Sequence, residues 1–241
     1  MMKAVDYKGW ARYIQLLMGV AGKETRRSRI KGETLLEFAC GTGNISLMMS
    51  GFGYNVTGMD SSESMLEVAR AKLSRRRGKP LRLLCADMVT GSCEGEFDRA
   101  VCVYDSINYI PTPEGLRHFF RNAFASLKEG GVFVFDASLE SNSLNDASLF
   151  VQRGRYKGTY YHRKSLYDPV TKIHKTYVRV RINDEIIEEV HMEYVYQLEL
   201  IRELFAAAGF VEKFAAGDFT MLEADEKSER VHFVLVKPRH D

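Results

Sequence analysis

Residues 34–43 read TLLEFACGTG, a short apolar run that ends in a glycine-rich turn. The run has the length and the composition of a buried β-strand. Gly41 and Gly43 let the backbone of the turn approach a ligand closely, and the helix expected after them would present unpaired N–H groups to that ligand. The stretch therefore predicts a strand, a ligand-binding turn and a helix, in that order.

The same alternation continues beyond the turn. Four more apolar runs of strand length follow, and apolar side chains at helical spacing separate several of them. Strands that alternate with helices predict an α/β fold in which a parallel sheet carries helices on both faces. The further strands are expected at residues 55–60, 81–86, 97–104 and 131–137, and the helices at 45–49, 65–73 and 116–127.

The last third of the chain breaks this alternation. Three segments rich in Tyr, Val and Ile are separated by the turn signals Asp168-Pro169 and Asn183-Asp184. The alternation of side chains along the second segment is typical of antiparallel strands. We predict an antiparallel β-meander inserted at residues 150–196 of a single domain, 1–241. Its strands are expected at 158–167, 173–182 and 186–196, followed by a helix at 198–205 and two final strands at 211–217 and 231–236.

The composition narrows the class of function. The chain has 241 residues, of which 45 % are apolar and 27 % are charged, as in an ordinary globular protein. A formal net charge of +2 favours a small-molecule partner over nucleic acid or a membrane. Four cysteines without a CxxC pair indicate a reducing compartment and no metal site. The first 21 residues lack a long apolar run, so we expect a cytoplasmic protein.

Acidic side chains stand at the ends of three consecutive predicted strands. Glu37 could accept hydrogen bonds from the ammonium group of an amino acid, and Asp60 could accept them from the hydroxyls of a ribose. Asp87 could reach an adenine amino group, with Met88 beside the ring. An amino acid, a ribose and an adenine together describe S-adenosylmethionine.

Each of these residues also has a purely structural interpretation. Glu37 could face a helix, Asp60 could cap one, and Asp87 could belong to a turn. The segment Gly41-Thr42-Gly43 with Ser46 is also similar to a degraded dinucleotide fingerprint, which makes a nucleotide-linked oxidoreductase the competing hypothesis.

Several longer segments resemble class I methyltransferases. They are EFACGTGN (37–44), VTGMDSSESMLEVA (56–69), CADM (85–88), FDRAVCVYDSINYI (97–110) and EGGVFVFD (129–136). The motif DSINY and the later HMEYVY followed by LIRELFAAAGF resemble a group of uncharacterised small bacterial and archaeal methyltransferases with a β-insert before the sixth strand. The resemblance implies a Rossmann-like sheet of seven strands, the last one antiparallel, and S-adenosylmethionine as cofactor.

The resemblance also assigns the cofactor contacts. It implies a methionine-binding turn in which Ala39 stands where glycine is commonest, and it implies that the carbonyl group of Tyr104 contacts the cofactor's amino group. Tyr13, on an N-terminal helix with Trp10, could cap the carboxylate side of the cofactor or be a core aromatic. The expected cofactor-binding residues are Glu37, Ala39, Gly41, Gly43, Asp60, Ser61, Asp87, Met88, Tyr104 and Tyr13.

Methyl transfer from a sulfonium is an in-line displacement, so a protein contributes mainly by orienting the acceptor and excluding water. A general base helps only when the acceptor arrives protonated. Polar residues after the fourth strand and His191 in the last strand of the insertion are the candidates for this chemistry. His191 has Glu189 and Glu193 on its own face, and a surface charge pair is its alternative interpretation. The candidates after the fourth strand are Asp105, Asn108 and Tyr109.

We therefore expect a methyltransferase that acts on nitrogen or oxygen of a small molecule. Besides the oxidoreductase, a non-catalytic module that binds S-adenosylmethionine is an alternative. RNA methylation is disfavoured because DSINY lacks the NPPY-type pattern used on flipped bases. The insertion would serve as a lid over the acceptor or as the surface of a homodimer.

Overall fold

The computed structural model describes residues 6–20, 32–74, 81–93, 97–147, 150–156, 159–182 and 185–239. Its helices are α1 (Tyr7–Val20), α2 (Asn44–Phe52), α3 (Glu63–Ser74), the 3-10 helix η1 (Ser106–Tyr109), α4 (Pro113–Ser126), α5 (Glu140–Ala147) and α6 (Leu198–Ala207). Its strands are β1 (Thr34–Phe38), β2 (Asn55–Asp60), β3 (Arg82–Cys85), β4 (Phe97–Cys102), β5 (Leu127–Ser138), β6 (Phe150–Tyr156), β7 (Thr159–Asp168), β8 (Ile173–Ile182), β9 (Glu185–Tyr194), β10 (Val211–Gly217) and β11 (Arg230–Val236).

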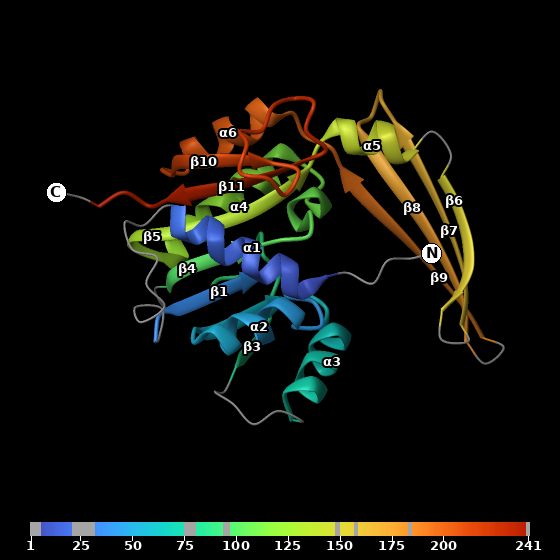
Figure 1. Ribbon diagram of the computed structural model, residues 1–241, viewed down its shortest axis with the longest axis horizontal. Helices are drawn as coiled ribbons and strands as arrows, with labels where there is room; N and C mark the ends of the chain where they lie inside the picture. Colours follow the sequence, from blue (N-terminus) through green and yellow to red (C-terminus); the bar gives the residue numbers. More distant parts are fainter. Residues whose placement is uncertain are drawn as a thin grey trace.

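Seven strands form a mixed sheet in the order β10-β11-β5-β4-β1-β2-β3 (Figure 1). The pairs within β1 to β5 are parallel, whereas β11 runs antiparallel to β5 and β10 antiparallel to β11. The carboxyl ends of β1 to β5 therefore share one edge, where open α/β sheets bind their ligands. The predicted fold class and the antiparallel last strand are confirmed.

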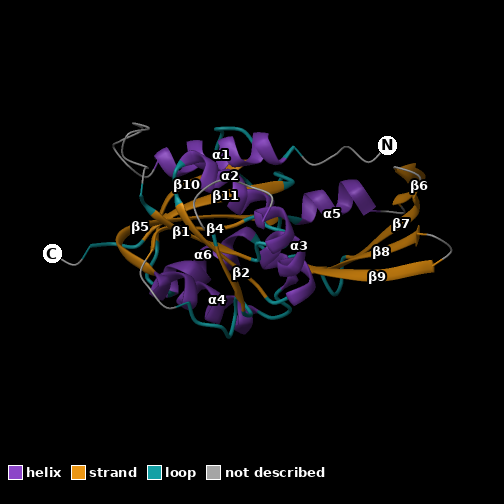
Figure 2. Cartoon of the chain, turned by 90° about the horizontal axis from the view of Figure 1, so that it is seen from below, coloured by secondary structure: helices purple, strands orange, loops and turns teal. Residues whose placement is uncertain are grey.

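Helices cover both faces of this sheet (Figure 2). The helices α1 and α2 pack on an aliphatic core that includes Leu35, Val101 and Val134. The helices α4 and α6 pack on the other face, where phenylalanines such as Phe119 and Phe133 dominate. Strands buried on both faces must be apolar throughout, which explains why they read as continuous runs in the sequence.

The strand β5 is longer than predicted. The sequence indicated a start at residue 131, yet the strand begins at Leu127 and pairs with Phe97 of β4. Gly130 adopts a left-handed backbone with φ of 75°, and the register with β4 shifts between Phe97 and Arg99. The pair Gly130-Gly131, which is typical of a turn, here forms a β-bulge-like irregularity within the continuous strand β5.

The insertion is a separate antiparallel sheet in the order β6-β7-β8-β9, beside α5 in Figure 1. The sequence predicted three of these strands and missed β6, because charged Arg153 and Arg155 flank Gly154 and weaken the pattern. A Cβ at position 154 would come within 3.0 Å of the Tyr161 side chain, which would have to shift to admit a larger residue.

The last strand of the insertion also ends earlier than predicted, at Tyr194 instead of residue 196. Tyr196 turns into the core, and its hydroxyl donates a hydrogen bond of 2.5 Å to the Ile110 carbonyl. The short helix α5, which was not predicted, packs on β7. Among the helices of the described residues, none combines the length and the apolar character needed to cross a membrane.

Candidate active site

The turn after β1 has the backbone that its glycines predicted. Gly41 and Gly43 both have positive φ, of 52° and 73°. A Cβ on Gly43 would lie 3.1 Å from the Cβ of Ala69, so this position has neither the backbone nor the space for a larger residue. Ala39 also has a left-handed backbone, with φ of 50°, where its methyl group is tolerated at some energetic cost.

Glu37 is buried at the end of β1, with 3 % of its surface exposed. Its carboxylate accepts a hydrogen bond from the Ser46 hydroxyl of α2. Burial raises the pKa of Glu37 from an ordinary 4.5 to about 8, although the Ser46 hydrogen bond opposes the change and the nearby charge of Asp60 adds to it. A buried carboxyl group of this kind gains from a cationic partner, which would favour its ionised form.

Asp60 ties the end of β2 to two neighbouring segments. One carboxylate oxygen accepts a hydrogen bond of 2.7 Å from the Gly41 N–H, and the other accepts one of 2.9 Å from the Ser62 N–H. The side chain that caps α3 is that of Ser62, which accepts from the Met65 N–H at 3.3 Å, so Asp60 supports the residue before the helix and does not cap the helix itself. Each oxygen of Asp60 can still accept a second bond, as the ribose interpretation requires. Ser61 lies between Asp60 and Ser62 in the sequence and is exposed.

Asp87 is a turn residue in this structure. One of its carboxylate oxygens accepts hydrogen bonds from the Val89 and Thr90 N–H groups, at 2.8 and 2.9 Å. The carbonyl group of Met88 accepts one of 3.3 Å from Asn122 of α4. These bonds fix the loop after β3 at the same edge of the sheet as Glu37 and Asp60.

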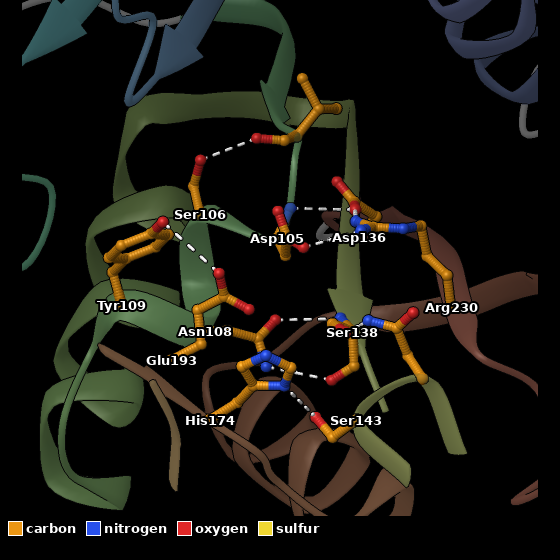
Figure 3. A network of polar contacts seen from close by, with 12 residues as sticks. Asp105, Ser106, Asn108, Tyr109, Asp136, Ser138, Ser143, His174, Glu193 and Arg230 are labelled. Atoms are coloured by element: carbon orange, nitrogen blue, oxygen red, sulfur yellow. Dashed lines mark hydrogen bonds and ion pairs between the residues drawn. The ribbon is translucent and has the colours of Figure 1, made fainter. Parts of the chain in front are cut away.

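The turn after β4 carries the most unusual backbone of the site. Tyr104 and Asp105 are consecutive non-glycine residues with positive φ, of 63° and 49°. The Asp105 N–H donates a hydrogen bond of 3.0 Å to Asp136 at the end of β5. Arg230 of β11 contacts the carboxylates of both, at 2.7 Å from Asp105 (Figure 3). We call the segment 103–106 the post-β4 turn.

The structure brings Tyr109 and His191 together, although they are 82 residues apart. The Tyr109 hydroxyl lies 3.3 Å from the Nδ1 atom of His191 and 3.5 Å from a carboxylate oxygen of Glu193. The Nε2 atom of His191 lies 3.3 Å from Glu189. The insertion thus reaches η1 through β9, as Figure 3 shows for Tyr109 and Glu193.

Glu193 has an altered acidity. Its pKa is raised to about 7, mainly by burial and also by the charge of Asp105, whereas the charges of Arg230 and Arg163 oppose the change. Burial likewise raises the pKa of the Tyr109 hydroxyl above its ordinary value. This cluster therefore holds a carboxylate that titrates near neutral pH beside a hydroxyl and an imidazole.

Asn108 does not face the reacting groups, contrary to the expectation for this segment. Its side chain is buried, and its amide nitrogen donates to the carbonyls of Ser138 and Tyr194, each at 3.0 Å. Its amide oxygen accepts from the Ser138 N–H at 2.9 Å. The side chain is occupied by the backbone on both sides, so its role is structural.

Tyr13 is not available to donate to the cofactor's carboxylate. Its single hydroxyl proton goes to the Thr220 carbonyl at 2.7 Å. Its ring packs against His232 at 4.9 Å between ring centres, in an aromatic cluster where Trp10 stacks on Tyr104 at 4.2 Å. The core-aromatic interpretation of Tyr13 fits this structure better than the capping one.

Comparison with known proteins identifies the fold and the class of enzyme. Residues 35–131 match a family model described as a methyltransferase domain. The chain therefore contains a methyltransferase domain. YqeM of Bacillus subtilis (strain 168), which is named a methyltransferase, is 28 % identical over 99 % of this chain and 94 % of its own length. The methyltransferase-domain match does not favour the oxidoreductase hypothesis.

Solved structures of methyltransferases share the whole fold. An S-adenosylmethionine-dependent methyltransferase from Clostridium acetobutylicum ATCC 824 superposes with a TM-score of 0.85 at 23 % identity, over 98 % of this chain and 93 % of that one. CalS10 from Micromonospora echinaspora, an amino pentose methyltransferase solved with S-adenosylmethionine, has a TM-score of 0.76 at 22 % identity, with 98 % and 93 % covered. The predicted cofactor of the methyltransferase, S-adenosylmethionine, is confirmed at the level of this class.

Two charged residues of the methyltransferase site were missed in the sequence. Asp136 ends an apolar run as Asp60 does, and that signal could have identified it. Arg230 is 125 residues from Asp105 and is the first residue of β11. In the sequence it stands at the end of a charged segment, where no local pattern distinguishes it from its neighbours.

Proposed function

We propose that the methyltransferase transfers a methyl group to the nitrogen of a small amine, held between the post-β4 turn and β9. The observation that carries the proposal is the convergence of the Asp105 and Glu193 carboxylates beside the Tyr109 hydroxyl. Arg230 pairs with Asp105, but Glu193 has no ion pair of its own among the described contacts, and carboxylates attract an ammonium group and fix its orientation through charge-assisted hydrogen bonds. The amino pentose on which CalS10 acts supports an acceptor of this class.

The residues at the edge of the sheet fit S-adenosylmethionine. Glu37 is buried with a raised pKa and would hold the ammonium group of the cofactor. Asp60, with Ser61 beside it, would hold the ribose, and Asp87 with Met88 would contact the adenine. When bound, the cofactor supplies a methyl group on a positively charged sulfur. The turn of Ala39, Gly41 and Gly43 and the carbonyl of Tyr104 would complete the contacts.

The acceptor must lose a proton before its lone pair can attack. A free aliphatic amine is protonated at neutral pH, so a base within hydrogen-bond reach is useful. Glu193 and Asp105 would attract the cation. The Tyr109 oxygen would accept a proton from the ammonium group while its own hydroxyl proton moves to Nδ1 of His191, whose side chain is 39 % exposed and can release the proton to solvent. Closure of β9 over the post-β4 turn would make the insertion the lid of the site and keep bulk water from the methyl group.

A library of amines and the matching alcohols tests the proposal. Release of S-adenosylhomocysteine is measured for the native enzyme and for His191→Ala. We expect turnover of amines only, and a loss of about 10²-fold or more in kcat for the variant, as is typical when a general base is removed. Turnover of alcohols alone, or an unchanged His191→Ala with a good amine substrate, would contradict the proposal. Cofactor binding without any turnover would favour a non-catalytic module.

Two other expectations stay predictions. The insertion exposes apolar side chains on β9, among them Ile186 and Val190, which would suit a homodimer. Analytical ultracentrifugation of the native chain and of Val190→Glu would test that association. A cytoplasmic location would be tested by fractionation of the source cells.

A further inference from the structure

Arg230 lies at the start of β11 and connects three parts of the site. Its guanidinium donates to Asp105 at 2.7 Å and also contacts Asp136, and only 18 % of its side chain is exposed. The oxygen of Asp136 that Arg230 contacts also accepts the Asp105 N–H at 3.0 Å. Arg230 and Asp136 together therefore hold both the backbone and the side chain of Asp105, as Figure 3 shows.

The backbone that is held in this way is a strained one. Tyr104 and Asp105 are both left-handed, a conformation that asparagine, aspartate and glycine tolerate and that a bulky aromatic residue disfavours. Such residues persist only where surrounding contacts stabilise them, and they are found mainly at functional sites. The contacts that stabilise the post-β4 turn from outside include those of Arg230, Asp136 and Trp10, and the centre of the Tyr7 ring lies 5.5 Å from that of Tyr104.

Trp10 links the contacts of Arg230 to α1. Its ring stacks on Tyr104 at 4.2 Å, and the guanidinium carbon of Arg230 lies 5.7 Å from the centre of the same ring. Trp10 is the only tryptophan of the chain. Arg230 thus contacts the Asp105 side chain directly and the Tyr104 side chain through Trp10. The fluorescence of Trp10 therefore reports on the surroundings of this turn.

We infer that Arg230 is a positioning residue for methyl transfer, which holds the post-β4 turn in the shape that presents the Tyr104 carbonyl to the methyl donor and the Asp105 carboxylate to the acceptor. The inference rests on the proposed function for the roles of these two groups. It assigns Arg230 no contact with either reactant.

The positive charge of Arg230 also affects the acidity of the carboxylates around it. Glu193 faces Asp105 and Tyr109 from the β4–η1 segment, Arg230 from β11 and Arg163 from β7. Asp136 is fully buried, and its pKa is raised to about 6 even though Arg230 lowers it. Loss of the guanidinium would leave the carboxylates without this cation, so the pKa values of Asp136 and Glu193 would both rise.

Binding of S-adenosylhomocysteine tests the inference without any acceptor. Its dissociation constant is measured by calorimetry, and Trp10 emission is followed against pH, for the native enzyme, Arg230→Met and Arg230→Lys. We expect Arg230→Met to bind at least tenfold more weakly. We also expect the change of Trp10 emission that accompanies ionisation of Asp136 and Glu193, here called the Trp10 transition, to occur at a higher pH. Arg230→Lys, which keeps a positive charge, should recover part of the affinity and bring the transition back toward the native pH.

A matched control is Arg202→Met. Arg202 also contacts two carboxylates, Glu199 and Glu212, with 26 % of its side chain exposed, but it joins α6 to β10. Its variant should bind S-adenosylhomocysteine within about twofold of the native enzyme, as expected for a surface ion pair outside the site. An equal loss of affinity in both methionine variants would overturn the inference, because the effect would then be general.

A second variant keeps the test decisive if Arg230→Met does not fold. Asp105→Asn preserves the shape of the side chain but replaces a charge-assisted contact by a neutral one, so we expect affinity to fall about threefold to tenfold. Unchanged affinity and an unchanged Trp10 transition in folded Arg230→Met, or in both Asp105→Asn and Arg230→Lys, would overturn the inference. Absence of amine turnover by the native enzyme would instead overturn the proposed function.

Discussion

The two halves of the site are built in different ways. The half at the ends of β1 and β2 is closed by short-range bonds, between Gly41 and Asp60, 19 residues apart, and between Ser46 and Glu37, 9 residues apart. The half at η1 is closed by contacts that span 82 to 125 residues, from β9 and β11. The donor half is therefore a property of one β1–turn–α2–β2 unit, whereas the acceptor half depends on how the insertion and β11 are placed.

This difference predicts that the two halves respond separately to mutation. Changes in the donor half should weaken binding of the cofactor whatever the acceptor. Changes at Tyr109, His191 or Glu193 should alter turnover and its pH dependence with little effect on the cofactor, whereas Arg230 and Asp105 should affect both, because they hold the turn that presents the Tyr104 carbonyl.

Of the four substitutions that follow, Asp60→Ala has the largest expected effect. The Gly41 and Ser62 N–H groups would lose their acceptor, and the proposed contact with the ribose hydroxyls would be lost as well. Affinity for S-adenosylhomocysteine should fall by about tenfold or more, since each tenfold loss corresponds to about 1.4 kcal/mol. Calorimetry measures it. Asp168→Ala is the control, because Asp168 caps the β7–β8 turn by a similar bond of 2.9 Å to the Val170 N–H. Full affinity in Asp60→Ala would remove the basis for the donor half.

Glu193→Gln probes the acceptor half. Glu193 has a pKa of about 7, so it is neutral below that pH and the native enzyme should lose amine turnover as the pH falls through 7. The amide cannot ionise, so the variant should have roughly tenfold lower kcat/KM above pH 7 and should lack this acidic limb. Steady-state rates between pH 5.5 and 8.5 would show it. Glu188→Gln, which alters a 57 % exposed carboxylate on the opposite face of β9, should keep the native profile. A native profile in Glu193→Gln would exclude Glu193 as the titrating group.

Glu37→Gln should separate binding from stability. The raised pKa of Glu37 means that the folded protein keeps a proton between pH 4.5 and about 8 that the unfolded chain has released. The free energy of unfolding of the ligand-free protein therefore falls as the pH rises through this window. The glutamine variant lacks that loss and should be more stable at pH 8, by about 1 kcal/mol or more, while it binds the cofactor several-fold more weakly. Urea denaturation at pH 6 and pH 8 measures the first effect; a variant less stable than the native protein at pH 8 would contradict it.

The smallest expected effect is that of Tyr196→Phe. The buried hydroxyl bond to the Ile110 carbonyl joins the end of the insertion to the segment after η1. Its loss should cost about 1 kcal/mol of stability and raise the KM of the acceptor, without a change in affinity for S-adenosylhomocysteine. Thermal unfolding and steady-state kinetics measure the two effects. A change confined to the cofactor would show that the halves are not separate.

The difference between the halves also explains what the sequence could predict. Glu37, Asp60 and the glycines act within one local unit, so their spacing along the chain carries their geometry. Tyr109 and His191 were predicted as separate candidates, and only the fold brings them together. Arg230 and the structural role of Asn108 depend on tertiary pairing, which no local pattern encodes.

Asn108 bonds to the backbone at both places where the insertion joins the main sheet, Ser138 at the end of β5 and Tyr194 at the end of β9. The polypeptide thus departs into the second sheet and comes back from it at nearly the same point in space, as in segments that tolerate domain insertion. Recombination could replace residues 139–194 as a cassette while the donor half and its core stay intact. Acceptor choice in such enzymes would then evolve by exchange of this segment, whose two ends are both hydrogen-bonded to Asn108.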